Sequence, residues 1–314
     1  MAGLTRGSDM AEKNTGISAD TYIGTGFVEA PPRVSEWRRF IRVFFQRKLV
    51  IFGLVVLLIV IICAIFAPLI APYDPYIGNL SDSLAQPSWK YLLGTDIQGR
   101  DTLSRLIYGS QTALIVGFLT TVTSAIAGTF LGLVAGYFGG VINMVIMRAM
   151  DALMGFPMLL LALLISAVLG SGIQNVIIAL AVATLPGYAR VMQGLTLSIR
   201  ENDYIMAERA MGSDNTRIMM NHILPNTLAP MIVLVTLQLG TIILAEAGLS
   251  FLGIGITPPG AAWGSMVYDG YRFLLSNPVL SFAPGLAIML VVFAFNMVGD
   301  GLRDALDPRL RGIL

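Results

Sequence analysis

Few side chains in this sequence could carry out catalysis or bind a metal. The chain has 314 residues with one histidine, His222, and one cysteine, Cys63, which excludes HExxH zinc sites, cysteine clusters and internal disulfides. Ser250 lies in a GLSFL segment that lacks the second glycine of the GxSxG nucleophile motif. No GxxxxGKS or GxxxxGKT loop is present to bind the phosphates of ATP. We therefore predict no catalytic, cofactor-binding or metal-binding residues, so that any energy from nucleotide comes through another polypeptide.

Polar residues within long apolar segments are the remaining candidates for a functional site. Ion-driven carriers need ionisable groups inside the bilayer, and only Glu246 comes close to such a position. The candidate path-lining residues for a hydrogen-bonding solute are Thr120, Ser124, Gln238 and Glu246. The alternative is structural, because small and hydroxylic side chains commonly hold membrane helices together.

The composition places most of the chain in a membrane. The hydrophobic set makes up 55% of the residues and charged residues only 12%, whereas soluble domains carry about 25% charged residues. Lys plus Arg (20) and Asp plus Glu (19) nearly cancel, so the chain has no basic field that would hold nucleic acid. A soluble globular enzyme and a nucleic-acid partner are therefore excluded.

Long gaps between charged residues locate the membrane-spanning helices. One crossing of the roughly 30 Å hydrocarbon core needs about 20 apolar residues. The predicted spans are 49–70, 112–137, 156–169 with the turns before it, 173–195, 228–247 and 279–298. Arg148 and Asp151 share a helical face before the third span, and we expect them to form a local ion pair. The sequence thus predicts an all-α polytopic membrane protein with six transmembrane helices.

Charges outside the spans predict the orientation. Basic residues concentrate on the side of the two termini, while the other side carries only Lys90, Arg100, Arg105 and Arg272. By the positive-inside rule, both termini and the 200–226 loop are cytoplasmic. Residues 1–33 have the composition of a disordered cytoplasmic tail. Residues 34–48 combine aromatic and basic residues at helical spacing, which indicates an amphipathic helix on the lipid surface or a basic flank that orients the first span.

The segment from Arg200 to Asn226 is too long for a simple connection. Asn202 or Asp203 could cap a first helix, Gly212 could adopt a left-handed conformation, and Ser213 or Asp214 could cap a second helix. We expect Pro225 to end that second helix. The mixture of Tyr, Met and charged residues fits a surface that enters a protein cleft, and a plain connector is the alternative.

The same loop resembles a known family. Gly212 stands twelve residues before Leu224, with Ala207 at the expected distance, which is similar to the "EAA" loop of permeases in the binding-protein-dependent ABC importer superfamily. Met206, Glu208 and His222 depart from the usual pattern. Further segments resemble the dipeptide/oligopeptide/nickel branch, over roughly residues 35–312. They are LGTDIQGRDTLSRLIYG (93–109), YFGG (137–140), MRAMD (147–151), FP (156–157), EAGLSFLG (246–253), PP (258–259), WG (263–264) and GDGLRDALDP (299–308).

The resemblance implies a type I ABC importer permease of the inner membrane. Residues 49–314 would form the permease domain, with external loops 73–110 and 253–278 and a coupling loop at 200–226. The partners implied are a second related permease, two ABC ATPase subunits that bind ATP and Mg, an extracytoplasmic solute-binding protein and membrane lipids. The coupling residues implied are Tyr204, Ala207, Glu208, Arg209, Gly212, Asp214, Arg217, Leu224 and Pro225. Peptides are the expected cargo.

Other functions stay open from the sequence alone. A secondary carrier or facilitator without ATPases would show inverted repeats and ionisable residues at mid-span, and neither is clear here. A membrane anchor for a complex is a third class. Within the same family, nickel or oligosaccharide import are alternatives to peptide import, although the spans offer no Cys or His cluster for nickel.

Overall fold

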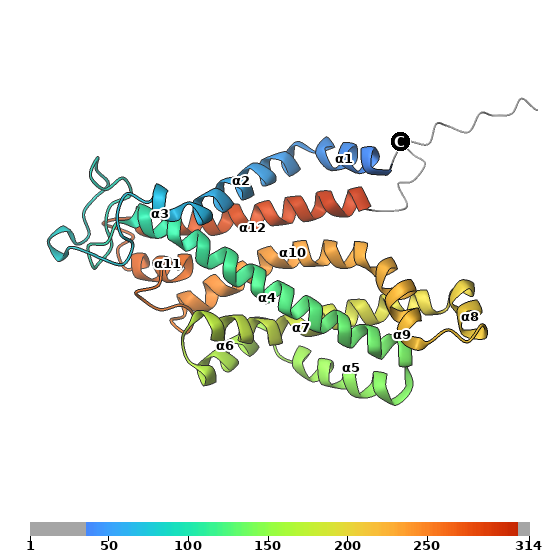
Figure 1. Cartoon of the computed structure of the whole chain (residues 1–314). Coiled ribbons are helices and arrows are strands. Elements are labelled where there is room, and N and C mark those ends of the chain that lie inside the picture. Colours follow the sequence, from blue (N-terminus) through green and yellow to red (C-terminus); the bar gives the residue numbers. More distant parts are fainter. Residues whose placement is uncertain (1–35, 307–314) are drawn as a thin grey trace, which may run out of the picture. The chain divides into compact units, whose positions relative to one another are not determined.

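Long apolar segments fold as helices because only a helix satisfies every backbone polar group of a single segment inside a membrane. The computed structural model describes residues 36–306, so the predicted 1–33 tail lies outside the described residues. Within them the helices, drawn in Figure 1, are α1 (Glu36–Gln46), α2 (Lys48–Ile65), α3 (Ala67–Ile70), η2 (Leu80–Asp82), α4 (Thr102–Phe138), α5 (Gly140–Met154), α6 (Met158–Leu169), α7 (Ile173–Arg200), α8 (Asp203–Ala210), α9 (Asn215–Arg217), η3 (Ile218–Ile223), α10 (Leu224–Phe251), α11 (Trp263–Tyr271) and α12 (Val279–Leu306).

Five of these segments are long and apolar enough to cross a membrane, or six if one bent pair counts as a span. The bent pair corrects the predicted third span, because α5 and α6 meet at an angle of 89°. Pro157 disfavours helical geometry at Phe156, and α5 ends just before it, at Met154. With 12 residues, α6 reaches about 18 Å at 1.5 Å per residue, too short to cross alone.

The predicted 34–48 element corresponds in part to α1, which ends at Gln46. Arg47 has an extended conformation and separates α1 from α2. Its guanidinium lies 2.7 Å from the carboxylate of Asp304 near the end of α12. The position of α1 on a lipid surface stays a prediction.

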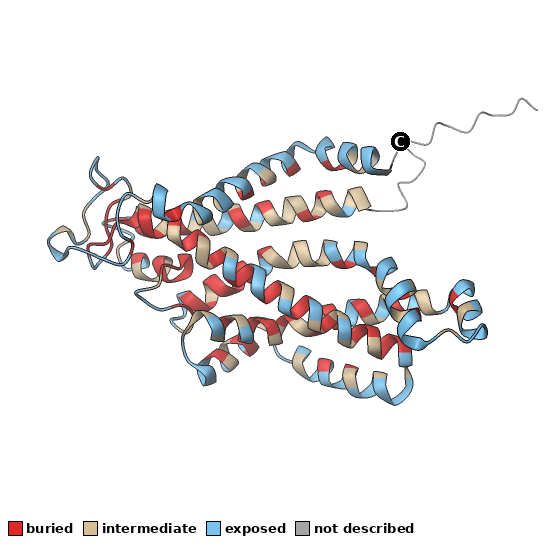
Figure 2. Ribbon diagram, in the orientation of Figure 1, coloured by how far each residue is buried: buried red, intermediate tan, exposed pale blue. Residues whose placement is uncertain are grey.

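Close contact between α4 and α7 organises the helices. Gly128, Gly132 and Gly136 lie one turn apart on α4 and face α7. A Cβ atom at Gly136 would lie 2.7 Å from the Cβ of Thr196, and one at Gly132 would overlap the carbonyl oxygen of Ala189. Small residues of this kind let membrane helices approach closely. Figure 2 shows buried residues along both helices.

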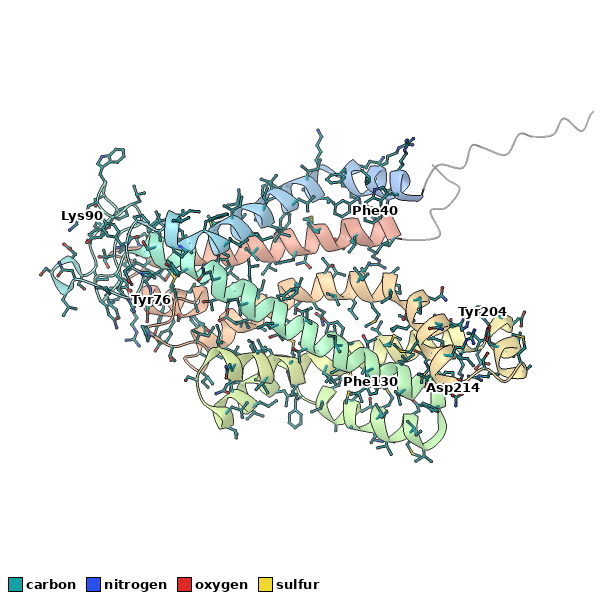
Figure 3. All side chains as sticks on the ribbon, in the orientation of Figure 1. Phe40, Tyr76, Lys90, Phe130, Tyr204 and Asp214 are labelled. Carbon is teal, nitrogen blue, oxygen red and sulfur yellow. The ribbon has the colours of Figure 1, made fainter. Side chains whose placement is uncertain are left out.

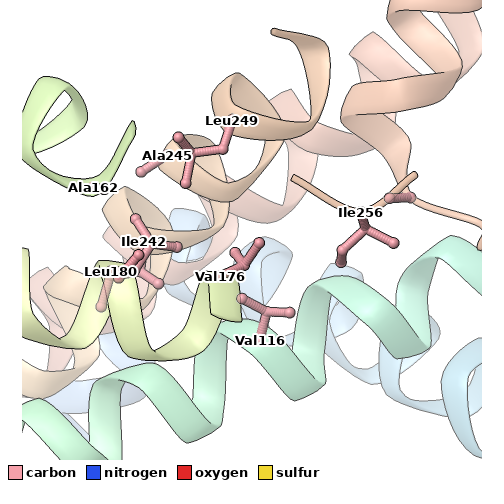
Figure 4. Close-up of a cluster of buried hydrophobic side chains, with 10 residues drawn as sticks. Val116, Ala162, Val176, Leu180, Ile242, Ala245, Leu249 and Ile256 are labelled. Carbon is pink, nitrogen blue, oxygen red and sulfur yellow. The ribbon is translucent and has the colours of Figure 1, made fainter. Parts of the chain in front are cut away.

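A second set of contacts joins α4, α6, α7 and α10. The buried residues in it, most of them labelled in Figure 4, are Val116, Ala162, Val176, Ala179, Leu180, Ile242, Ala245, Leu249, Ile256 and Ala262. Ile256 and Ala262 come from the connection between α10 and α11, so this cluster also holds that connection against the helices.

Residues 71–101 and 252–278, which we call the cap, lie at the end of the helices opposite α8 and α9 (Figure 1). Arg105, only 1% exposed, holds the two parts of the cap together. Its guanidinium donates to the carbonyl oxygens of Pro75 (3.0 Å) and Gly260 (3.2 Å), and its Nε lies 3.5 Å from Asp96. The Asp96 carboxylate also accepts from Arg100 Nε at 2.7 Å.

Burial and hydrogen bonds shift the pKa values of two carboxylates in the cap. Burial raises the pKa of Asp269 above its ordinary value, while nearby Arg105 and Arg100 act in the opposite direction. At the exposed edge, hydrogen bonds from Lys90 and then Tyr91 lower the pKa of Asp82. Figure 3 labels Lys90 in this part of the cap. The cap therefore carries a buried charged network and, at its edge, an exposed ion pair.

The α4–α7 contact can be tested by adding one methyl group. We expect Gly132→Ala to lower the free energy of unfolding by about 1–3 kcal/mol, because the added Cβ meets the backbone of α7. Gly194→Ala on α7 is the matched control, since a Cβ there meets nothing within 4 Å. The measurement is the thermal midpoint of the purified chain in detergent. Equal midpoints for the two variants would contradict the close contact.

The role of Arg105 can be tested by removing its charge. We expect Arg105→Gln to lower the stability of the cap by about 1–3 kcal/mol, because it leaves the carbonyl groups of Pro75 and Gly260 without their donor. Limited proteolysis of the cap measures this effect. The exposed Arg272, which contacts Tyr268 and Tyr271, gives the control variant Arg272→Gln. If both variants resist protease as the wild type does, Arg105 does not hold the cap.

Candidate functional site

The 200–226 loop folds as two short helical segments joined at a glycine. The first, α8, begins after Asn202, whose side chain makes no capping bond. Gly212 has a φ of +80°, the left-handed conformation predicted for it. Asp214 caps α9 by accepting a hydrogen bond from the backbone N–H of Thr216 at 2.9 Å.

Pro225 does not end the second helix, contrary to the prediction. After α9 the chain forms a π-helical segment, η3, and continues directly into α10. Pro225 lies in the first turn of α10. A helix tolerates proline in its first turn, and the wider hydrogen-bond spacing of η3 removes the need for a proline N–H at that point. The helical chain from Asn215 to Phe251 is therefore uninterrupted.

The inner face of the loop packs onto the long helices. Ile205, Ile218 and Ile223 are completely buried, in a cluster with Tyr137 and Met192. These contacts connect α8 and η3 to the ends of α4 and α7. The loop is therefore held in a defined orientation relative to the spans.

Tyr137 is the main polar anchor of the loop. Its hydroxyl donates to Asn215 Oδ1 at 2.7 Å, and the guanidinium of Arg209 lies 5.0 Å from the centre of its ring. Such a cation–π contact is weakly favourable. Arg200 adds two hydrogen bonds to the carbonyl oxygens of Gly136 and Tyr137.

Glu208 joins the two helical segments across Gly212. Its carboxylate accepts a hydrogen bond from the Ser213 hydroxyl, and His222 Nε2 lies 3.6 Å away on η3. Glu208 is one of the departures from the family motif, and in this chain it has a local structural partner on each side.

The outer face of the loop exposes large apolar side chains. Met211 is 74% exposed, and Tyr204 and Met206 are also exposed. Figure 3 shows Tyr204 and Asp214 at this end of the helices. The other predicted coupling residues on the surface are Ala207, Arg209, Asp214, Arg217 and Pro225, whereas Glu208 and Leu224 are half-buried. Exposed apolar groups beside charges are typical of an interaction surface.

The expected pair of Arg148 and Asp151 does not form. Asp151 accepts from Arg190 on α7 instead, and both Arg148 and Asp151 are exposed. The i,i+3 spacing permits the local pair, but α7 brings a second guanidinium to the same carboxylate. This contact links α5 to α7.

The four candidate path-lining residues lie on two helices, Thr120 and Ser124 on α4 and Gln238 and Glu246 on α10. Thr120 and Ser124 are buried in α4, where the Ser124 hydroxyl donates to the Thr120 carbonyl at 2.7 Å. Gln238 is half-buried on α10. Glu246 is buried and accepts from Ser250 at 2.7 Å, and Ser250 accepts from the Ile256 backbone N–H at 3.0 Å. In this chain Glu246 therefore holds the turn after α10, and its contact with a solute stays a prediction.

A groove of about 540 Å³ lies between α7, α10 and α12, near the 200–226 loop, and contains none of these four residues. Its lining is Val191, Asn226, Ala229, Pro230, Val233, Leu234, Leu237, Arg303 and Leu306. The sequence signals that could have identified it are the proline inside an apolar span and the arginine at the end of α12. Among the described residues, no group of three or more His, Cys, Asp or Glu could hold a metal.

Comparisons with known proteins place this architecture in a family. The model described as "Binding-protein-dependent transport system inner membrane component" matches residues 128–312. A model of the N-terminal membrane domain of oligopeptide transport permease C matches residues 35–87. A chain of the inward-facing MetNI methionine ABC transporter has a TM-score of 0.54 at 20% identity, and the match covers 65% of this chain and 96% of that one. That likeness shows the fold.

Relatives match over nearly the same length. A dipeptide transport system permease protein of Alkalihalophilus pseudofirmus is 45% identical over 278 residues, which cover 88% of this chain and 91% of the relative. A di/tripeptide transport system permease protein of Pseudomonas aeruginosa is 41% identical over 283 residues, 88% and 93% of the two chains. A glutathione transport system permease protein of Escherichia coli is 42% identical over 279 residues, 88% and 92%. With the family model covering more than half of its length, the chain belongs to the binding-protein-dependent inner-membrane components, the multi-pass permease subunits of ABC importers.

Proposed function

We propose that this chain forms one half of a translocation path for short peptides and is driven by ATPases that dock on its 200–226 loop. Two relatives are named as dipeptide and di/tripeptide transport system permeases, which supports the choice of cargo. Nickel and oligosaccharides are alternatives within the family. A carrier that works without ATPases has no support from the relatives, which are ABC-type permeases.

The observation that carries the proposal is the contrast between the two faces of the 200–226 loop. Its inner face is completely buried at Ile205, Ile218 and Ile223, whereas its outer face exposes Met211 and Tyr204. Aromatic residues and methionine are enriched in protein interfaces. A loop that is fixed to the spans and apolar on its outside fits the cleft of a cytoplasmic partner.

Continuity between loop and span supports a mechanical coupling. Asn215 to Phe251 form one helical chain, so a displacement of α9 reaches the membrane-spanning part of α10 directly. We infer that closure of two ATPase subunits on ATP and Mg displaces this loop and moves α10 relative to α12. Rigid-body movement of helices at an interface is a common way to switch between two conformations.

The remaining partners follow from the same proposal. A second related permease would complete the path. One ATPase would bind the 200–226 loop, and the other would bind the corresponding loop of the second permease. An extracytoplasmic solute-binding protein would dock on the cap, where Trp89 is 98% exposed and the apolar side chains of Ile77 and Leu80 are also exposed. This arrangement places both termini in the cytoplasm. Membrane lipids surround the spans.

Gly212 offers a sharp test of the coupling loop. We expect Gly212→Pro to abolish ATP-driven uptake while the chain still inserts in the membrane, because proline cannot adopt a positive φ. The measurement is accumulation of L-alanyl-L-leucine in proteoliposomes that contain the complete transporter and the solute-binding protein. ATPase co-purification is measured in parallel.

The matched control at the same position is Gly212→Asn. Asparagine tolerates the left-handed conformation, and an added Cβ there meets nothing within 4 Å, so we expect most of the uptake to remain. Full uptake by the proline variant, with ATPase still bound, would show that this loop does not couple. No accumulation by the wild-type complex would reject the proposed function itself.

Met211 tests the outer face of the loop. We expect Met211→Glu to weaken ATPase binding about tenfold or more, the size of effect typical of a central interface residue. Met211→Leu keeps the apolar surface and serves as the control. The dissociation constant of the ATPase from the permease complex in nanodiscs measures the difference. If the glutamate and leucine variants bind equally well, the outer face is not the ATPase surface.

A further inference from the structure

The groove between α7, α10 and α12 has the dimensions and lining of a small-molecule site. Its volume of about 540 Å³ falls within the range of about 300–1,000 Å³ that is usual for ligand pockets. Its walls are aliphatic, apart from Asn226 and Arg303. A mostly apolar pocket with a few polar groups is the common pattern for recognition of a small ligand.

Arg303 brings a positive charge to the groove. The ion pairs among residues 36–306 do not include Arg303, and the neighbouring Asp304 pairs with Arg47 instead. The Arg303 side chain is exposed, so its guanidinium is accessible to a ligand. The planar fork of a guanidinium binds a carboxylate through two parallel hydrogen bonds.

Asn226 brings hydrogen-bond acceptors. Pro230 lies four residues after Asn226 inside α10, and proline has no N–H, so the Asn226 carbonyl lacks the donor that a regular α-helix would supply. The side-chain Nδ2 of Asn226 already donates to the His222 carbonyl at 2.6 Å, which leaves its Oδ1 as an acceptor. Two oxygen acceptors suit an ammonium group, which only donates.

We propose that this groove is a holding site for a short peptide with two free termini. The peptide carboxylate binds Arg303, its ammonium group binds the oxygen atoms of Asn226, and its apolar side chains contact Val233, Leu234 and Leu237. This inference rests on the proposed function and adds to it the place where the permease itself contacts the cargo. Phosphatidylglycerol, an anionic lipid, would bind Arg303 through its phosphate but has no ammonium group for the oxygen atoms of Asn226.

The position of the site relates it to the coupling loop. Asn226 lies two residues after the start of α10, directly beyond η3, whereas Arg303 lies on α12. A displacement of the 200–226 loop therefore changes the separation of the two polar groups. A peptide held at both ends is bound in one conformation of the loop and released in the other.

The test is a binding measurement on the complete transporter in nanodiscs without the solute-binding protein. The probes are L-alanyl-L-leucine and L-alanyl-L-leucinamide, which lacks the carboxylate, and saturation-transfer NMR gives the dissociation constants. We expect Arg303→Gln to weaken binding of the dipeptide about tenfold or more, the usual effect of losing a hydrogen bond to a charged group. We expect the same variant to leave the weaker binding of the amide unchanged. Arg148→Gln, at an exposed arginine outside the groove, is the control and should bind both probes as the wild type does.

A second variant keeps the inference falsifiable if Arg303→Gln fails to fold. Leu234→Trp fills the groove and should remove binding of both probes while the ATPases stay attached. Unchanged dipeptide binding in Arg303→Gln, or in Leu234→Trp, would overturn the proposal. Displacement of every probe signal by phosphatidylglycerol, with no difference between dipeptide and amide, would show a lipid site instead. Uptake of the dipeptide by the wild-type transporter, measured separately, distinguishes failure of this site from failure of the proposed function.

Discussion

The close approach of α4 and α7 is the constraint on which the other contacts depend. Three glycines bring the two backbones together, and Tyr137 follows the last of them directly. That position places the Tyr137 hydroxyl beside Asn215 and its ring beside Arg209. The small glycines of α4 therefore set the orientation of the 200–226 loop. Through the loop they also set the position where α10 starts.

Much of the fold could be predicted from the sequence because charges are expelled from the hydrocarbon core. Charge-free gaps located the long helices, and the positive φ of Gly212 followed from its place between two capping signals. The bent α5–α6 pair was missed, because an apolar stretch of suitable total length gives no sign of a turn within it except Pro157. The end of the second loop helix was misplaced at Pro225, since the rule that proline ends a helix ignores its tolerance in a first turn.

Tertiary contacts explain the other differences. Asp151 pairs with Arg190, which lies 39 residues further along the chain on another helix, and spacing along one helix cannot reveal such a contact. Arg105 was counted among the charges on the side opposite the termini, yet it is buried and its guanidinium donates to carbonyl groups from two separate loops. The candidate path-lining residues were chosen by polarity alone. In the structure Ser124 and Glu246 form hydrogen bonds within their own helices, whereas the groove depends on Pro230, Asn226 and Arg303 from separate turns and helices.

The π-helical turn at Ile218–Ile223 has a consequence for the way force crosses the molecule. Its hydrogen bonds join residues five apart, so it winds more loosely than the α-helices before and after it. A loosely wound turn can tighten toward α geometry and thereby take up rotation of one end relative to the other. Conversion of Ile218–Ile223 to α geometry would therefore rotate α9 relative to α10 about their shared axis.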